Sequence, residues 1–130
     1  MDRLWKAAPG VGAFALLTIC LSATAHHSFS GQFDRNLPVA FDGVVTKVEW
    51  QNPHVWFYVD AEDEDGNVIH WEAETTNPNA LLRRGWGPDD LKVGDHVAVD
   101  GFRAICCENV MNAQNVTLPD GRRVFARDAR

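Results

Sequence analysis

Between residues 39 and 74, apolar and polar side chains alternate with a period of two, which is the pattern of β-strands with one buried face. A first run covers 39–50 and contains Gly43, where a strand can bend. Two further runs, 54–60 and 68–74, flank an Asp65-Gly66 pair, which is a strong signal for a β-hairpin turn. The pattern therefore predicts three strands, the last two joined as a hairpin.

A helix signal follows the third strand. Asn77 is a suitable N-cap, residues 80–84 have the composition of one to two helical turns, and Gly85 ends them. This is the only helix that the sequence predicts. Period-two runs then resume and predict three more strands, at 96–102, 110–118 and 123–125.

This order of elements predicts an all-β fold: a small OB-fold-like Greek-key barrel of five to six strands, with one short helix between strands 3 and 4. A small β-sandwich is the alternative. We expect the barrel domain over 37–125, a polar N-terminal arm over 26–36 and a frayed tail over 126–130.

The first 25 residues have the features of a cleaved secretory signal peptide. Arg3 and Lys6 precede an apolar run over 11–21, and the small residues Ala23 and Ala25 fit a cleavage site. The run is shorter than the roughly 20 residues that cross a bilayer, and no later run reaches that length. We therefore expect a periplasmic or secreted protein without a membrane span after cleavage.

Composition and charge exclude several classes of protein. With 23% charged and 45% hydrophobic residues, the 130-residue chain is of ordinary globular composition. Its net charge of −6 opposes binding to nucleic acid, which needs a basic surface. No nucleophile elbow, phosphate-binding glycine loop, HExxH or CxxC motif supports hydrolase, kinase, zinc-protease or thioredoxin chemistry.

Cleavage after Ala25 would leave His26 with a free α-amine beside its own imidazole. Amine and ring Nδ1 can chelate one metal ion, and a further histidine would complete the three-nitrogen arrangement called a histidine brace. Such nitrogen ligation favours copper. His54 is the best third ligand, because the turn at Asn52-Pro53 puts it at the start of a strand, near the mouth of the barrel.

The other histidines have weaker claims to this site. His27 follows His26 on an extended arm and so points to the opposite side, which leaves it as an exchange ligand. His70 and His96 are out of phase with the core residues of their strands, so solvent-exposed side chains are the simpler interpretation of both. The alternative for His26 and His27 is a polar, disordered arm with no metal.

Once the signal peptide is removed, Cys106 and Cys107 are the only cysteines. Being adjacent, they cannot close a loop. They can form a vicinal disulfide, pair with another molecule, bind a soft metal ion or remain two thiols without a role.

Several segments together resemble the DUF6152 family of small exported bacterial proteins, whose function is uncharacterised. They are Ala25-His-His-Ser-Phe29, Gly43-Val-Val-Thr-Lys-Val-Glu-Trp50, Asn52-Pro-His-Val-Trp56, Pro78-Asn-Ala-Leu-Leu-Arg-Arg-Gly-Trp86 and Leu118-Pro-Asp-Gly-Arg122. The resemblance covers the AHHSF start, His54 and an acid at Glu74, and it implies a place for Glu74 at the site, as an axial or supporting group. The Cys106-Cys107 pair departs from the family pattern.

The sequence thus predicts an exported copper-binding protein that uses His26, His54, His27 and Glu74. Carriage, buffering or sensing of metal, with a periplasmic protein as partner, fits such an exposed site better than catalysis. One rival is a metal-free OB-fold module that binds a peptide, glycan or protein. The other is a copper oxidase or monooxygenase, which a chain this short would shelter poorly.

Overall fold

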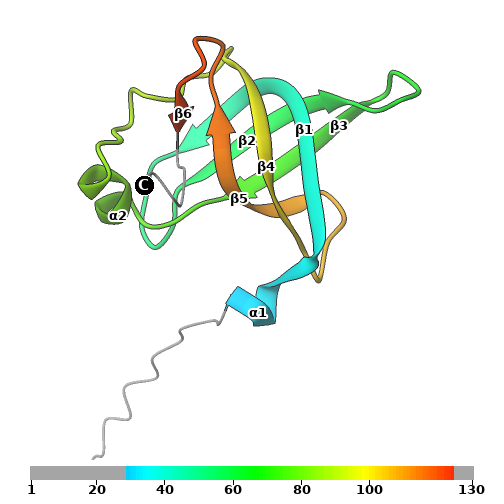
Figure 1. Cartoon of the computed structure of the whole chain (residues 1–130), viewed down its shortest axis with the longest axis horizontal. Helices are drawn as coiled ribbons and strands as arrows, with labels where there is room; N and C mark the ends of the chain where they lie inside the picture. Colours follow the sequence, from blue (N-terminus) through cyan, green and yellow to red (C-terminus); the bar gives the residue numbers. More distant parts are fainter. Residues whose placement is uncertain (1–28, 125–130) are drawn as a thin grey trace, which may run out of the picture.

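Six strands and two short helices make up the computed structural model, which describes residues 29–124. In chain order they are α1 (Phe29–Gln32), β1 (Phe33–Glu49), β2 (Trp56–Glu62), β3 (Val68–Glu74), α2 (Pro78–Arg83), β4 (His96–Ala104), β5 (Val110–Thr117) and β6 (Arg123–Val124). The strands form one sheet in the order β3-β2-β1-β4-β5-β6, and neighbours in this order are antiparallel (Figure 1). The prediction of a mostly β protein is confirmed.

The sheet closes into a partial ring because β5 also pairs with β3. This pairing is parallel and joins Glu72–Glu74 to Val110–Asn112. At 17 residues, β1 is long enough to pair with β4 through its earlier residues and with β2 through its later ones. Gly43 lies where the two pairings overlap, and a Cβ atom there would come within 2.5 Å of the Asp60 carbonyl oxygen. Only glycine therefore fits at this bend.

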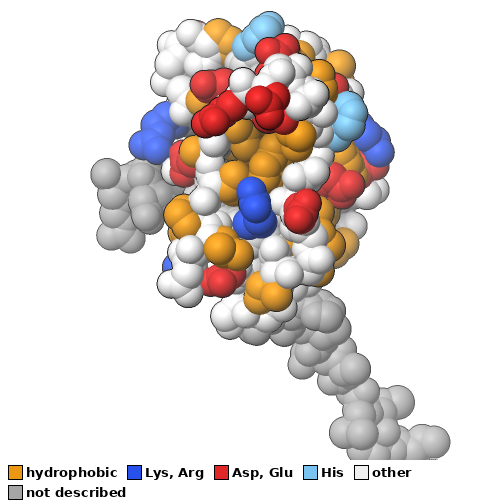
Figure 2. Space-filling view, turned by 90° about the vertical axis from the view of Figure 1, so that its right-hand side faces the viewer, with side chains coloured by type: hydrophobic (Ala, Val, Ile, Leu, Met, Phe, Trp, Pro, Cys, Tyr) orange, Lys and Arg blue, Asp and Glu red, His pale blue; other side chains and the backbone are white. Residues whose placement is uncertain are grey.

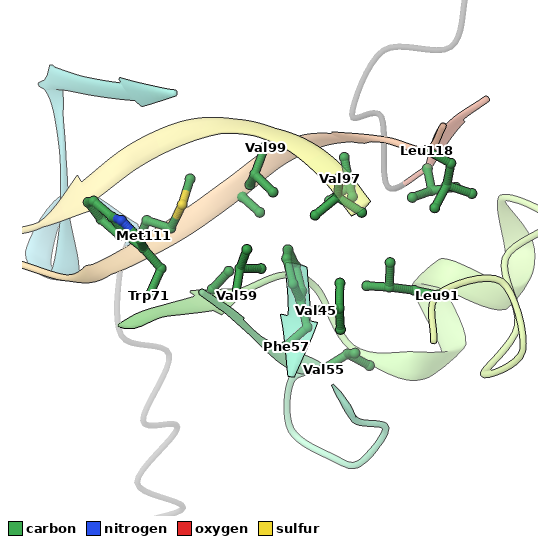
Figure 3. Close-up of a cluster of buried hydrophobic side chains, with 14 of the residues drawn as sticks. Val45, Val55, Phe57, Val59, Trp71, Leu91, Val97, Val99, Met111 and Leu118 are labelled. Atoms are coloured by element: carbon green, nitrogen blue, oxygen red, sulfur yellow. The ribbon is translucent and has the colours of Figure 1, made fainter. Parts of the chain in front are cut away.

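The core lies inside the partial ring. In β2 and β4, buried side chains alternate with more exposed ones, as the period-two sequence pattern predicts. Apolar side chains from five strands and the loops between them meet there (Figure 3): Val45, Val55, Phe57, Val59, Trp71, Leu91, Val97, Val99, Met111 and Leu118. Burial of this apolar surface is the main favourable contribution to folding.

The predicted turn and helix signals are both confirmed. Asp65-Gly66 lies in the tight connection from β2 to β3, where Gly66 has a φ of 82°. Asn77 caps α2, since its side-chain oxygen accepts a hydrogen bond of 2.9 Å from the Ala80 backbone N–H. From α2, the fully buried Leu81 packs into the core.

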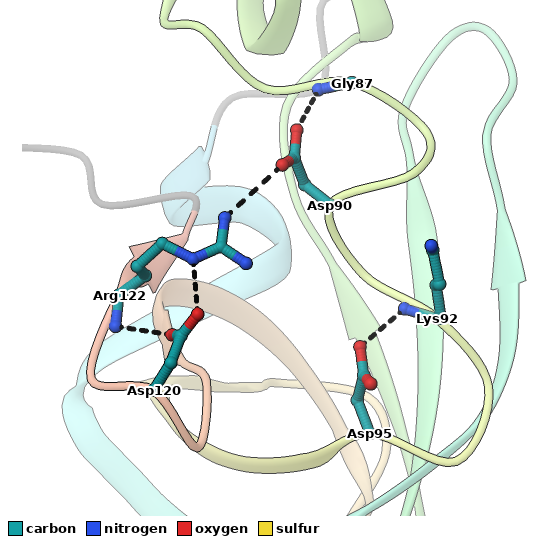
Figure 4. A network of polar contacts seen from close by, with 6 residues as sticks. All are labelled: Gly87, Asp90, Lys92, Asp95, Asp120 and Arg122. Atoms are coloured by element: carbon teal, nitrogen blue, oxygen red, sulfur yellow. Dashed lines mark hydrogen bonds and ion pairs between the residues drawn. The ribbon is translucent and has the colours of Figure 1, made fainter.

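Polar contacts join the α2–β4 connection to the β5–β6 turn (Figure 4). Asp90 accepts a 2.7 Å hydrogen bond from the backbone N–H of Gly87, and its other carboxylate oxygen lies 3.6 Å from the Arg122 guanidinium. Arg122 also donates to Asp120 at 2.6 Å. These contacts, part-buried at Asp90 and exposed at Arg122 and Asp120, link two connections that are distant in sequence.

The N-terminal part of the fold differs from the prediction. The prediction of a single helix is wrong, because α1 precedes the sheet, and β1 begins at Phe33 rather than near residue 39. The reason is aromatic packing: the Phe29 ring lies 5.5 Å from that of Phe33 and 6.1 Å from that of Phe102. The sequence pattern does not predict this packing, because Phe29 and Phe33 stand among polar residues. The predicted signal peptide (1–25), His26, His27 and the tail (126–130) lie outside the described residues.

Candidate functional site at His54 and Glu74

His54 lies just before β2, directly after a cis Asn52–Pro53 peptide bond. The β2–β3 ladder extends to residues just before β2 and just after β3. The Val55 backbone N–H donates to the Thr76 carbonyl at 3.0 Å, and the Thr75 N–H donates to the Val55 carbonyl at 2.9 Å. Residues two apart share a face of a strand, so His54 lies on the same face as Trp56, whose cross-strand partner is Glu74. The extended ladder therefore brings His54 next to Glu74.

Glu74 is a buried acid at the end of β3. Its side chain is only 7% exposed, and its backbone is paired with both β2 and β5. Such a carboxylate needs a polar partner, because burying an unpaired charge is costly. That partner is His54, whose ring Nδ1 contacts the Glu74 Oε1.

This contact determines which His54 nitrogen is free to bind something else. In the neutral tautomer that donates Nδ1–H to a carboxylate, the His54 ring keeps its lone pair on Nε2. The His54 side chain is 44% exposed, so a ligand can reach it from solvent.

A pocket of about 290 Å³ lies over this pair. Its walls come from α1 and the start of β1, from the residues after β3, from α2 and from β5. In addition to His54 and Glu74, the lining residues are Phe29, Gln32, Phe33, Thr75, Thr76, Leu81, Arg84, Asn112, Ala113 and Gln114. Amide, hydroxyl and guanidinium groups thus surround the histidine and carboxylate on a partly apolar floor. The pocket suits a small polar ligand or an ion better than an extended polymer.

The structure thus brings together two of the four predicted site residues, His54 and Glu74. The other two, His26 and His27, lie outside the described residues, so their part remains a prediction. Within residues 29–124, no group of three or more histidines, cysteines and acids could hold a metal ion. In the described part of the chain, the pocket therefore supplies an incomplete set of metal ligands.

His70 and His96 are exposed. The ring Nδ1 of His70 lies 2.6 Å from Asp60, its cross-strand neighbour, and its side chain is 79% exposed. Neither residue lines the pocket. The expectation that both side chains face solvent is confirmed.

The pocket walls were missed in the sequence. Phe29 and Gln32 belong to the stretch interpreted as a polar arm, and Asn112 and Gln114 appear as the polar positions of an ordinary alternating strand. Nothing in the sequence placed these two amides near His54. In the structure, Asn112 is the β5 partner of Glu74, and both amides line the pocket.

Acidic residues form a second polar region, away from the pocket. The segment Glu62–Asp65 is exposed in the β2–β3 hairpin, and Asp63 accepts backbone hydrogen bonds from Asp65 and Asn67. The face toward which this hairpin points carries acidic side chains around an exposed hydrophobic area (Figure 2). The hydrogen bonds give Asp63 a turn-forming role.

Comparison with known proteins gives one match. A family model described as "Family of unknown function (DUF6152)" matches residues 14–108. The chain belongs to the DUF6152 family. No curated protein and no solved structure matches it.

The DUF6152 match confirms the resemblance found in the sequence and spans all four predicted site residues. It also spans Cys106 and Cys107, whereas β5 and β6 lie beyond it. The pocket is therefore built partly from matched segments and partly, at Asn112 and Gln114, from residues after them. Among the residues described, no helix has the length and apolar character to cross a membrane.

Proposed function

We propose that this protein is exported and binds one copper ion at the His54–Glu74 pocket, with His26 as the partner ligand. One observation carries the proposal: the pocket that holds His54 and Glu74 is also lined by Phe29, three residues after His26. Three residues of extended chain span at most about 11 Å. A processed N-terminus at His26 is thus tethered within reach of the pocket.

Within this proposal, the His26 α-amine and ring Nδ1 and the His54 Nε2 are three nitrogen ligands for copper. Both His26 nitrogens lose their protons readily near neutral pH, since their reference pKa values lie near 8 and 6.5. Nitrogen-rich ligation and the affinity order of divalent ions both favour Cu(II). His27 is an exchange ligand.

Glu74 acts through His54 in this arrangement. Metal-binding histidines usually donate their other ring N–H to a carboxylate, which fixes the orientation of the ring and makes it more basic. The Glu74 contact with His54 Nδ1 has this form. It favours a supporting role for Glu74 over that of an axial ligand.

Carriage, buffering or sensing of copper suits this site better than catalysis. The half-exposed His54 ring allows an ion to enter and leave, and a periplasmic protein would be the donor or acceptor. The location, periplasmic or secreted, rests on the predicted signal peptide. We also propose that the partial ring is an OB-fold-like barrel, because α2 lies between β3 and β4 and β5 pairs with β3.

The test is a Cu(II) titration of the exported protein, purified with its native N-terminus, while mass spectrometry establishes the first residue. We expect one tight equivalent, which is lost in His54→Ala and in a form carrying one extra residue before His26. His70→Ala is the matched control, because His70 also contacts a carboxylate across β2 and β3 but lies outside the pocket. It should bind copper like the wild type.

Three results would overturn the proposal: an exported chain that begins elsewhere than at His26, no tight equivalent, or an equivalent that survives His54→Ala. Binding that persists in both variants would place copper elsewhere. Complete indifference to copper would favour the metal-free binding module. Reduction of dioxygen to peroxide by ascorbate, in a reaction that depends on His26, would favour the oxidase.

A further inference from the structure

Cys106 and Cys107 form a disulfide in the loop between β4 and β5. All five residues of this loop, 105–109, are exposed. Of the four alternatives left open by the sequence, the structure shows the vicinal disulfide. Its exposure makes both sulfur atoms accessible to small reagents and ions.

The bond contributes little to holding the fold together. A disulfide stabilises a protein mainly by restricting the unfolded chain, and the effect grows with the number of residues in the closed loop. Here the bonded residues are neighbours in the chain, so almost no additional restriction results.

Backbone hydrogen bonds hold the loop at both ends instead. Ile105 donates to the Gln32 carbonyl of α1 at 2.9 Å, and the Asn109 carbonyl accepts from Glu72 of β3 at 2.9 Å. Neither bond involves a cysteine. The loop therefore keeps its place when the disulfide is reduced.

Reduction would create a pair of soft ligands. The disulfide joins the two sulfur atoms, and the two thiols formed from it stay on neighbouring residues of one loop, within reach of a single ion. Thiolates are the protein ligands that select Cu(I) and other thiophilic ions. Two thiolates satisfy the low coordination number that Cu(I) accepts.

We propose that the reduced Cys106–Cys107 pair is a binding site for a monovalent, thiophilic copper ion, separate from the nitrogen ligands at His54. A dithiol gives the disulfide two electrons and its own two thiol protons and becomes a disulfide itself, whereas a phosphine takes the oxygen of a water molecule whose two protons complete the thiols. Binding of Cu(I) then displaces these protons. When a disulfide-containing oxidant accepts two electrons from the pair and is itself reduced to two thiols, the Cys106–Cys107 disulfide forms again, both ligands are lost and the ion is released.

The experiment uses the full exported chain, reduced with a water-soluble phosphine and desalted without oxygen. The phosphine takes the oxygen of one water molecule and leaves two thiols. Cu(I) is then titrated against a chromophoric Cu(I) chelator. We expect one equivalent of Cu(I) in the reduced protein and none at this site in the oxidised protein.

The variants separate this site from the pocket. The double variant Cys106→Ser/Cys107→Ser should lose the Cu(I) equivalent, whereas Glu108→Gln, in the same loop, should keep it. His54→Ala should also keep it, so failure of the copper pocket and failure of this site are distinguishable. Far-ultraviolet circular dichroism of the serine variant checks that the fold is retained, as expected for two exposed side chains.

A second probe tests the chelating geometry without copper. Phenylarsine oxide condenses with two thiols to form a cyclic dithioarsenite and one water molecule. Mass spectrometry should show one adduct on the reduced wild type and none on either single serine variant. A Cu(I) equivalent that survives in the double serine variant, or a reduced wild type that binds neither probe, would overturn the proposal.

Discussion

The two ends of the β2–β3 hairpin carry the same pair of side-chain types in opposite surroundings. At the pocket end, the His54 ring contacts a Glu74 carboxylate that is 7% exposed. Nearer the turn, the His70 ring contacts an Asp60 carboxylate that is 35% exposed. A contact between a histidine and an acid therefore occurs at both ends. The candidate site differs from the turn end because its acid is buried and a pocket lies over its histidine.

The two ends of the hairpin also differ in strand pairing. At Glu74, β3 has partners on both sides, β2 and β5, whereas the described pairing of β3 with β5 ends at Glu72. Near the turn, β3 thus has β2 alone as its partner. Pairing on both sides does not by itself bury a side chain, because Glu72 has the same two partner strands and is exposed. Glu74 also lies in the pocket whose walls come from α1, α2 and β5.

The largest expected effect is on the free energy of unfolding, when a valine is replaced by alanine at each end of the hairpin. Val55→Ala, at the fully buried pocket end, should lower the free energy of unfolding by about 2–4 kcal/mol, from lost burial and a cavity. Val68→Ala, where the side chain is 51% exposed, should change it by less than about 0.5 kcal/mol. Urea unfolding of both variants measures the difference. Equal losses would mean that the turn end is as well packed as the pocket end.

The next effect tests the two acids and rests on the proposed copper site. Glu74→Gln keeps the size of the side chain but removes the charge that orients and polarises His54, so Cu(II) affinity should fall by about 10-fold to 100-fold. Asp60→Asn makes the same change at His70 and should leave the affinity unaltered. Competition titrations with a chelator of known affinity measure both. Equal losses of Cu(II) affinity in the two variants would show that Glu74 has no special role in copper binding.

The predictable part of the fold is local. The alternation of apolar and polar residues predicted the strands, Asp65-Gly66 predicted the hairpin, and Asn77 predicted the start of α2. Each of these features depends on residues that are neighbours in the chain. The β3–β5 pairing joins segments almost 40 residues apart in the chain, and no local pattern encodes it. The packing of Phe29 against Phe102 joins residues still farther apart in the chain.

The candidate site also has a part that could be predicted from the sequence and a part that could not. His54 was predictable from Asn52-Pro53, and the family resemblance pointed to Glu74. Their mutual contact, and the burial that gives it significance, depend on the ladder beyond β2 and on β5. Asn112 and Gln114 could not be assigned to the pocket without that pairing.

The smallest effect lies at the exposed turn and depends on pH. Hydrogen bonds from the Asn67 side chain and backbone, with smaller ones from Asp65 and Gly66, hold the pKa of Asp63 below its usual value. A carboxylate whose pKa is lower in the folded state stabilises the fold above its unfolded pKa of about 3.9, and this contribution is lost as pH falls through the folded pKa. Asp63→Asn should therefore lower the free energy of unfolding at pH 7, and its difference from the wild type should shrink toward pH 3.

Glu64→Gln removes a neighbouring charge from the same exposed turn and serves as the control. Urea unfolding of each variant against the wild type, at pH 7 and at pH 3, cancels the titration of all other groups. A deficit for Asp63→Asn that stays constant with pH would show that its hydrogen bonds stabilise the turn through geometry and not through charge. A deficit that shrinks would show that the ionised Asp63 carboxylate stabilises the turn end of the hairpin.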